Sequence, residues 1–261
     1  VGGTLGHPNT LAMFLELLLP LGVSLLFGPL DRQVKLVAGL AVVLGGLGLV
    51  ATLSRGGVMA TAFGVVLILW SRWSKALGLV RAGVALALTI IALTSLLFVI
   101  PNPVRTRIVE HDYGNAYGRV PNMEVAFNII RDRPLLGVGL NNYTEAARAY
   151  DHTPEQIIAL WNAPVHSLFL FIAGEVGLIG LASFLLLLIG VVRALLPALR
   201  SPDPLVASAG LGIVVGLMAF LLHSQVDYSS WPLFDTLWFL LGLSVGIGRL
   251  SAALWTVPPE G

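Results

Sequence analysis

The sequence contains no cysteine and few charged residues. Of its 261 residues, 11% are Asp, Glu, Lys or Arg, whereas an ordinary soluble domain carries about 25%. The absence of cysteine excludes disulfides, thiolate nucleophiles and metal sites with cysteine ligands. The formal net charge is only +1. The composition therefore gives no reason to expect a nucleic-acid partner, which needs a clustered basic face.

Hydrophobic residues, in contrast, make up 56% of the chain, and the mean hydropathy is +0.88. These values indicate an integral membrane protein. Because about twenty apolar residues span a bilayer, we expect seven spans, at residues 9–27, 34–53, 57–73, 80–100, 167–192, 205–223 and 234–250. The predicted fold is an all-α, polytopic transmembrane helix bundle, with four spans in residues 1–100, a loop domain at 101–166 and three spans in residues 167–261.

The Lys and Arg residues of the short loops predict the orientation of the spans, because cytoplasmic loops are enriched in them. Basic residues fall in every second connection between the spans and at the final end, and all of these segments would be cytoplasmic. The residues are Arg32, Lys35, Arg72, Lys75, Arg81, Arg193, Arg200 and Arg249. The opposite side would hold the 101–166 loop and the turn from His223 to Asp235. Arg55 stands on that side in a very short turn, against the charge rule. Such a charge needs a reason, so Arg55 is a site candidate.

The 101–166 loop is expected to fold as a helical cap with little core of its own. Apolar residues at helical spacing predict a helix over 122–131. Two further helices are expected over 143–150 and 154–161, the second with Thr153 as its N-cap.

The stretch Pro164–Gly180 places ionisable residues at the entrance to a membrane span, where desolvation is costly and polar groups are candidates for function. His166 can accept a proton from a hydroxyl group, because imidazole titrates near neutral pH. The alternative is a capping or interfacial histidine. Both interpretations are compatible with its spacing.

Three glycines follow at three-residue spacing: Gly174, Gly177 and Gly180. Small residues at regular spacing favour close helix packing in lipid, and we expect that role here. Glu175 lies nine positions after His166, about two and a half helical turns away. This separation favours a structural role for Glu175 over a catalytic partnership.

Two arginines suit a diphosphate ligand, because guanidinium stays charged and offers fork-shaped donors to phosphate oxygens. Arg55 stands in the turn Ser54-Arg55-Gly-Gly, where contact with lipid headgroups is the alternative. Arg119 stands in Gly114-Asn-Ala-Tyr-Gly-Arg-Val-Pro121, where a solvated surface arginine is the alternative.

His223 and Asp227 are four residues apart at the outer end of the sixth span, on one helical face if the helix continues. Each could then orient the other, and both are candidate site-lining residues. A zinc site would need a third ligand such as His166 or His7, and no signature such as H-E-x-x-H is present. We therefore expect no metal. G-x-S-x-G, Walker and dinucleotide motifs are also missing, so no cofactor is predicted.

Three of these motifs together resemble the bacterial O-antigen ligases. His166-Ser167, nine residues and Gly177-Leu-Ile-Gly180 resemble the family signature H-[NSQ]-x9-G-x-x-G. The segment 118–139 resembles the family's arginine, amphipathic helix and P-L-L-G-x-G, although Val120-Pro-Asn-Met replaces a common aromatic residue. The Ser54-Arg55-Gly-Gly turn matches the family's other arginine site. The resemblance covers nearly the whole chain.

The resemblance implies a GT-C-like fold and a metal-independent glycosyltransferase of the bacterial inner (cytoplasmic) membrane. Such enzymes take a glycan from undecaprenyl diphosphate at the periplasmic face. The acceptor is the lipid A core in ligases, a growing glycan in polymerases or a protein hydroxyl in O-oligosaccharyltransferases. By this resemblance, Arg55 and Arg119 would bind the diphosphate, and His166 would deprotonate or orient the acceptor hydroxyl for inverting attack. Because the chain starts in mid-motif at Val1, we expect a longer protein with further N-terminal helices.

A transporter of polyprenyl-linked glycans is the alternative from a different class. Such a protein is expected to show inverted repeats and polar residues at mid-membrane depth, and the sequence shows neither pattern. A purely structural subunit would leave Arg55 and His166 without a purpose. The sequence therefore favours transfer chemistry.

Overall fold

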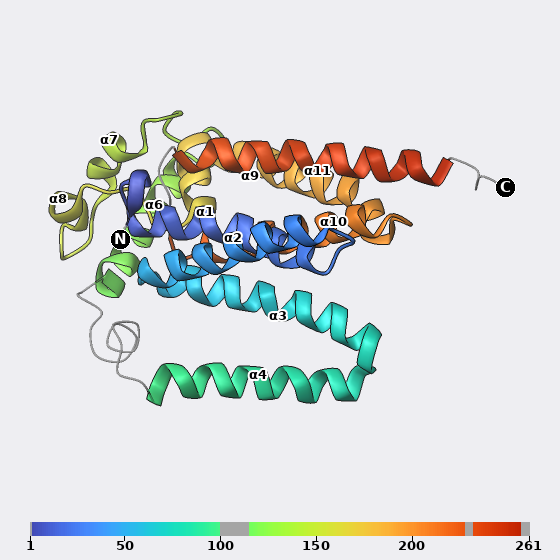
Figure 1. The fold of residues 1–261 in the computed structure, drawn as a ribbon. Coiled ribbons are helices and arrows are strands. Elements are labelled where there is room, and N and C mark those ends of the chain that lie inside the picture. Colours follow the sequence, from blue (N-terminus) through green and yellow to red (C-terminus); the bar gives the residue numbers. More distant parts are fainter. Residues whose placement is uncertain (1, 100–114, 228–231, 257–261) are drawn as a thin grey trace. The chain divides into compact units, whose positions relative to one another are not determined.

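The computed structural model describes residues 2–99, 115–227 and 232–256, and within these ranges every regular element is a helix (Figure 1). Residue 100 of the fourth expected span, residues 101–114 of the expected loop domain and residues 228–231 of the turn after His223 lie outside the described residues.

The chain forms two compact units, each built from segments that are distant in sequence. Unit 1 consists of Val1–His111, Val191–Leu221 and Ser230–Gly261. Unit 2 consists of Asp112–Gly190 and Leu222–Ser229. Residues 167–190 thus cluster with the segment that precedes them.

The long helices begin within two residues of the seven predicted starts. They are α1 (Pro8–Leu26), α2 (Arg32–Ala51), α3 (Arg55–Leu77), α4 (Leu79–Val99), α9 (Leu168–Leu195), α10 (Pro204–His223) and α11 (Pro232–Thr256). Six of them are long and apolar enough over their described residues to cross a membrane. The seventh, α4, is described as an apolar stretch over Leu79–Thr89. The protein is thus an all-α, multi-pass membrane protein, as predicted.

Within unit 1, two glycines let α10 approach α1 closely. A Cβ atom at Gly212 would lie 2.5 Å from the Cα atom of Leu21, and one at Gly216 would lie 2.5 Å from the carbonyl oxygen of Leu17. The four-residue spacing is the G-x-x-x-G pattern of membrane helices, whose association depends on close packing. Larger side chains here would force the two helices apart.

Arg72 of α3 links three helices at one end of unit 1. Its terminal nitrogen donates hydrogen bonds to Ser208 Oγ at 2.8 Å and to Ser24 Oγ at 3.5 Å. Ser24 Oγ in turn donates to the carbonyl of Ser208 at 2.7 Å, and both serines are fully buried. The guanidinium carbon also lies 5.9 Å from the centre of the Phe27 ring. These contacts satisfy both serine hydroxyls and one terminal nitrogen of Arg72, which would be costly to bury unpaired.

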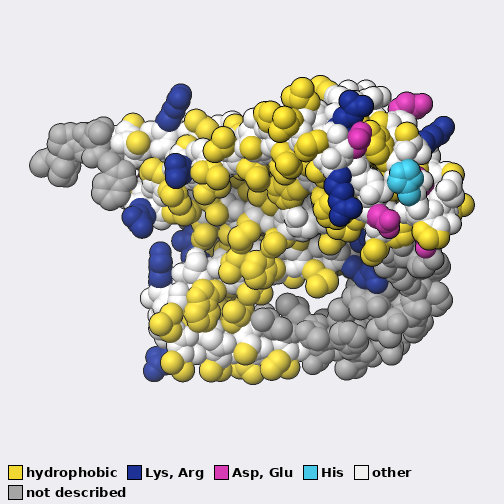
Figure 2. Space-filling model, turned by 180° about the vertical axis from the view of Figure 1, so that it is seen from behind, with side chains coloured by type: hydrophobic (Ala, Val, Ile, Leu, Met, Phe, Trp, Pro, Cys, Tyr) yellow, Lys and Arg dark blue, Asp and Glu magenta, His cyan; other side chains and the backbone are white. Residues whose placement is uncertain are grey.

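The antiparallel order of the helices in unit 1 brings the basic residues of the short loops to one end. α1 and α3 end there, and α2 and α4 begin there (Figure 1). Figure 2 shows Lys and Arg side chains at this end of the long helices and hydrophobic side chains along their length. This distribution is the one expected if that end faces the cytoplasm. The cytoplasmic assignment itself stays a prediction.

Unit 2 contains the helices of the expected cap. They are α6 (Asn115–Asp132), α7 (Tyr143–Ala147), the 3-10 helix η2 (Arg148–Tyr150), α8 (Ile157–Trp161) and the first part of α9. α7 and η2 together cover the helix predicted over 143–150. α6 begins earlier than predicted. α8 is shorter, although Thr153 Oγ1 does accept a hydrogen bond from the Ile157 N–H at 3.2 Å.

The prediction that the cap has little core of its own is wrong. Eight side chains, each at most 2% exposed, pack together: Val125, Ala126, Ile129, Tyr143, Ala147, Ile157, Ile158 and Val165. The helical period places the three members from α6 on one face. The other members come from α7, α8 and the segment before α9. Each of these elements contributes too few apolar residues to reveal the core by its own sequence.

Candidate functional site

The helix α9 is interrupted at Gly177, within unit 2. The backbone dihedral angles of this residue are φ 71° and ψ −176°, which are outside the helical region and favour glycine. The segment Pro134–Gly139 lies against the interruption, and the Leu178 N–H donates to the carbonyl of Pro134 at 2.8 Å. A backbone donor released by the break therefore finds a partner on this loop, as buried backbone groups require.

The loop also completes the helix on the other side of the interruption. The Val138 N–H donates to the carbonyl of Gly174 at 2.9 Å, and the Gly139 N–H donates to the carbonyl of Glu175 at 2.8 Å. Residues 134–139 and 174–179 thus form one backbone joint, which we call the loop–helix joint. The two glycine-containing motifs that the sequence placed far apart are the two halves of this joint.

Glycine is required in the joint because the two backbones touch. A Cβ atom at Gly177 would collide with the carbonyl of Leu135, and one at Gly137 would collide with the carbonyl of Gly174. A Cβ atom at Gly174 would lie 2.6 Å from the ring of Tyr143. The close packing expected at Gly174 and Gly177 is present, whereas a Cβ atom at Gly180 would meet only Val176 of the same helix. The expected packing partner was another helix. The partner is instead a loop and an aromatic ring of the same unit.

Glu175 has the structural role that its spacing favoured. Its side chain is buried, and its Oε1 atom accepts a hydrogen bond from the Tyr143 N–H at 3.3 Å. Glu175 therefore fixes the start of α7 against α9. Burial raises the pKa of Tyr143 well above its ordinary value, so this phenol stays neutral in the core.

His166 lies two residues before the first residue of α9. The carbonyl of Ser167 accepts the hydrogen bond from the Phe171 N–H at 2.9 Å that closes the first turn of the helix. Val165, on the other side of His166, is fully buried in the cap core. The Nδ2 atom of Asn122 donates to the carbonyls of Ala163 and Pro164 at 3.3 and 3.4 Å. The histidine therefore stands, partly buried, on a segment held from both sides.

The end of α10 lies beside the start of α9 within unit 2. The Leu168 N–H donates to the carbonyl of Ser224 at 2.8 Å, one residue after His223. α10 ends at His223, so the helix does not continue to Asp227. The Asp227 N–H instead donates to the carbonyl of His223 at 3.1 Å in a turn, and both side chains are buried.

Asp227 forms an ion pair with Arg119 of α6. The Nη2 atom of Arg119 lies 3.5 Å from Oδ2 of Asp227, and the two side chains are 34% and 4% exposed. A buried carboxylate thus holds a guanidinium that still reaches the surface. Arg119, Asp227, His223 and His166 all belong to unit 2, and the hydrogen bond from Leu168 ties their segments together.

Arg55 belongs to unit 1, where it is the first residue of α3. Ser54 caps the helix, because its Oγ accepts a hydrogen bond from the Gly57 N–H at 3.3 Å. Ser54 is in turn held by Thr52, whose Oγ1 accepts from the Ser54 N–H at 3.1 Å. A Cβ atom at Gly57 would lie 2.7 Å from the Cβ of Ala12, so α1 and α3 meet at this turn. Arg55 is thereby fixed at the positive end of a helix dipole.

His7, one of the two histidines considered as a third zinc ligand, caps a helix. His7 Nδ1 accepts a hydrogen bond from the Asn9 N–H at 3.2 Å and caps α1 in unit 1. In the part of the chain that the structure describes, no three His, Asp or Glu side chains are grouped to hold a metal ion.

A family model described as O-antigen ligase matches residues 40–185, which is more than half of the chain. The chain belongs to the O-antigen ligase family. The region that the family model matches contains Arg55, Arg119, His166 and both halves of the loop–helix joint, whereas Asp227 lies beyond it. No curated protein matches this chain. Membership in the O-antigen ligase and polymerase superfamily indicates activity of the glycosyltransferase type on a lipid-linked glycan in a membrane.

The structure adds two positioning residues that the sequence did not reveal. Asn122 holds the segment before His166, and Tyr143 packs against Gly174 and Phe171, with the two ring centres 5.4 Å apart. Asn122 was visible only as one polar residue in an amphipathic helix. Its unusual burial, at 1% exposure, appears only once the cap is folded.

Proposed function

We propose that the protein moves a glycan from undecaprenyl diphosphate to a hydroxyl group of an acceptor, without a metal ion. The acceptor is the lipid A core, as in a ligase, and the site faces the periplasm from the inner membrane. The family match over residues 40–185 carries this proposal, because it includes the two arginines and the histidine to which we assign chemistry. A polymerase or a protein O-oligosaccharyltransferase would use the same residues on a different hydroxyl group.

The arginines would stabilise the diphosphate leaving group. Negative charge develops on this group as the glycosidic bond breaks, and preorganised cations in a water-poor site lower the energy of that state. Arg119 suits this role, because Asp227 fixes its guanidinium while a third of the side chain remains exposed. Arg55 suits it too, because anions are favoured at a helix N-terminus.

His166 would take the proton from the attacking hydroxyl group. A sugar hydroxyl is a poor nucleophile, and a positioned base raises the rate of such steps by about 10²–10⁴-fold. The Asn122 contacts and the first turn of α9 hold the His166 segment in place. The new bond forms between the acceptor oxygen and the anomeric carbon. The old bond to the diphosphate oxygen breaks, and the attack inverts the anomeric configuration.

The experiment that tests this proposal follows glycan transfer by the full-length protein in membranes, with an undecaprenyl diphosphate-linked glycan as donor. We expect His166→Ala, Arg119→Ala and Arg55→Ala each to lower the transfer rate by about a hundredfold or more. Arg200→Ala is the matched control, because this exposed arginine lies on the predicted cytoplasmic side. Its rate should equal that of the wild type.

Membrane insertion and thermal stability of each variant separate loss of chemistry from loss of folding. Normal transfer by all three well-inserted variants would contradict the assigned roles. If the wild type only carried the lipid-linked glycan across the bilayer and left the diphosphate bond intact, the protein would be a transporter. The mobility of the product identifies the acceptor and thus separates ligase from polymerase.

A further inference from the structure

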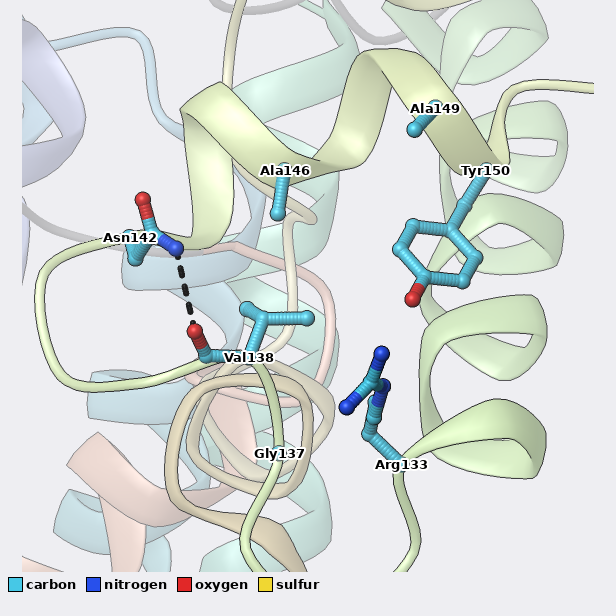
Figure 3. A pocket seen from close by; sticks show the side chains of 7 residues that line it. All are labelled: Arg133, Gly137, Val138, Asn142, Ala146, Ala149 and Tyr150. Atoms are coloured by element: carbon cyan, nitrogen blue, oxygen red, sulfur yellow. Dashed lines mark hydrogen bonds between the residues drawn. The ribbon is translucent and has the colours of Figure 1, made fainter.

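Unit 2 contains a pocket of about 290 Å³ that none of the proposed reacting residues lines. Arg133 and Tyr150 lie on one side of it, Val138 and Asn142 on the other, and Ala146 and Ala149 above (Figure 3). We propose that this pocket binds one uncharged sugar unit of the glycan substrate. The proposal rests on the proposed function, but it assigns a binding site separate from the groups that would react.

The pocket stands on the loop–helix joint, which gives it a fixed floor. Gly137 and Val138 line the floor, and Val138 is bound through its N–H to the carbonyl of Gly174 in α9. The Nδ2 atom of Asn142 donates to the carbonyl of Val138 at 3.0 Å. The amide oxygen of Asn142 is turned away from Val138 (Figure 3). Asn142 is exposed, so this oxygen is an acceptor at the rim.

The opposite wall is held by a network around Asp132. Its Oδ2 atom accepts hydrogen bonds from the Tyr150 hydroxyl at 2.7 Å and from Arg133 Nε at 3.1 Å. Asn128 fixes the backbone of Tyr150 as well, because its Nδ2 atom donates to the Tyr150 carbonyl at 3.1 Å. The Arg133 side chain is 64% exposed and is joined to this network by the hydrogen bond from its Nε atom.

The charge of this wall selects the kind of ligand. The Tyr150 hydrogen bond and Arg133 lower the pKa of the Asp132 carboxyl below its usual range, so Asp132 is ionised at neutral pH. The carboxylate balances the guanidinium, and the pair has no net charge. Only the Nε atom of Arg133 contacts Asp132, so the terminal N–H donors remain for the hydroxyl groups of a neutral sugar. The Asp132 carboxylate is 56% exposed and repels an anionic ligand, whereas the carboxylate that pairs with Arg119 is 4% exposed.

The size and lining of the pocket also suit a sugar. Ligand sites occupy about 300–1,000 Å³, and this pocket is at the lower limit, which fits one ring and not a polyprenyl chain. Tyr150 offers an amphipathic ring with a polar tip beside the guanidinium. Ala146 and Ala149 lack the bulk that would fill the space. A larger residue at either position would close it.

The proposal is tested by the binding of a free glycan to the full-length protein in nanodiscs, measured by saturation-transfer NMR. The ligand is the oligosaccharide released from the cell's own lipid-linked donor. We expect Arg133→Ala to weaken binding about tenfold, which is the effect of losing a hydrogen bond to a charged group. Ala149→Trp, which fills the pocket, should abolish binding. Arg131→Ala removes an exposed arginine two residues away, in the last turn of α6, and should change nothing.

Equal binding by the wild type, Arg133→Ala and Ala149→Trp would overturn the proposal. If an acidic or phosphorylated monosaccharide displaced the glycan far better than a neutral one did, the pocket would be an anion site, which also contradicts it. Arg133→Gln keeps donors without charge and should bind at least as well as Arg133→Ala. This exposed substitution keeps the test valid if Ala149→Trp fails to fold.

Transfer kinetics separate this proposal from the function on which it rests. Arg133→Ala should raise the KM for the glycan substrate about tenfold with kcat unchanged, because the pocket binds a part of the substrate that does not react. If the wild type transfers no glycan but the binding differences remain, only the proposed function fails. If transfer occurs and Arg133→Ala leaves both KM and glycan binding unchanged, only the pocket proposal fails.

Discussion

The two units satisfy their backbone hydrogen bonds in different ways. Unit 1 does so almost entirely within long regular helices, which approach one another through small residues such as Gly212 and Gly216. Unit 2 interrupts a membrane helix at Gly177 and completes it with the loop Pro134–Gly139. Backbone groups that a break in a helix releases need other partners. The loop–helix joint provides them from the loop Pro134–Gly139.

The difference indicates where precise positioning is needed. Regular helices in lipid can tilt and slide at modest cost, whereas a joint with several interlocking backbone hydrogen bonds has one register. In unit 2 the joint, Asn122 and the Arg119–Asp227 pair fix the segments around His166. In unit 1, Arg55 lies at a capped helix end. The predictions below weaken one unit at a time.

The largest effect is expected from breaking the loop–helix joint with Gly177→Val. A side chain at this φ costs about 1–3 kcal/mol, and overpacking against Leu135 costs about 1–3 kcal/mol more. The free energy of unfolding of the purified protein should therefore fall by about 2–6 kcal/mol. Thermal or denaturant unfolding in detergent measures this change. Gly190→Ala is the control, because a Cβ atom there meets nothing within 4 Å. Equal stability of Gly177→Val and the wild type would show that the joint is not needed.

Core truncation should cost more in unit 2 than in unit 1. Ile129 in the cap and Ile68 in α3 are both fully buried. Ile129→Ala loses the transfer free energy and leaves a cavity, so about 2–5 kcal/mol is expected. Ile68→Ala should cost about 1–2 kcal/mol, because lipid is as apolar as the helix interface and mainly the cavity remains. The comparison fails if urea or thermal unfolding gives the same loss for both variants.

Much of this architecture follows from the sequence, because its signals are local. Seven apolar runs gave the helix starts to within two residues, and the spacing of apolar residues gave most of α6. Gly174 and Gly177 were correctly associated with close packing. Their partner was missed because an apolar run with glycines looks the same whether it faces a helix or a loop. The φ of Gly177 is set by the loop and not by its neighbours in sequence.

The long-range contacts could not be predicted from one sequence. Arg119 and Asp227 are 108 residues apart, and no local pattern links them. Helical spacing would have placed His223 and Asp227 on one face, but α10 ends at His223, and the Asp227 carboxylate forms an ion pair with Arg119. The cap core was missed for the same reason, since its members come from four short segments. Local patterns give elements and candidate residues, whereas the fold decides the partners.

A smaller effect is expected from the ion pair that positions Arg119. Asp227→Asn keeps the shape of the side chain but removes the charge that holds the guanidinium. We expect about tenfold slower transfer at low donor concentration, because a tenfold change corresponds to about the free energy of one charge-assisted hydrogen bond. Steady-state kinetics should show the change in KM for the donor. Glu145→Gln, an exposed acid of the same unit, should leave the kinetics unchanged. An unchanged KM in Asp227→Asn would remove Asp227 from the site.

The smallest effect concerns the pH dependence of α8. Partial burial acts to raise the pKa of Asp151, but hydrogen bonds from Thr153 and the Ile158 N–H outweigh it and lower the pKa below its usual value. A lowered pKa in the folded protein means that the stabilisation is complete above the ordinary value of about 3.9 and is lost as the pH falls through the folded value.

Hydrogen exchange of the segment 151–161 should therefore speed up once the pH falls well below about 4, after correction for the intrinsic exchange rate. Asp151→Asn should remove this acid dependence. If the same acid dependence persisted in Asp151→Asn, another group would be responsible.

The central claim, transfer of a glycan from a polyprenyl diphosphate, is tested most directly by stoichiometry. The full-length protein in nanodiscs is given a donor labelled differently in the glycan and in the lipid, together with lipid A core as acceptor. We predict one free undecaprenyl diphosphate for each glycan joined to a hydroxyl group of the acceptor, with both products formed about a hundredfold more slowly by His166→Ala. Glycan that reaches the far side of the membrane still joined to its lipid, with no diphosphate released, would contradict the account.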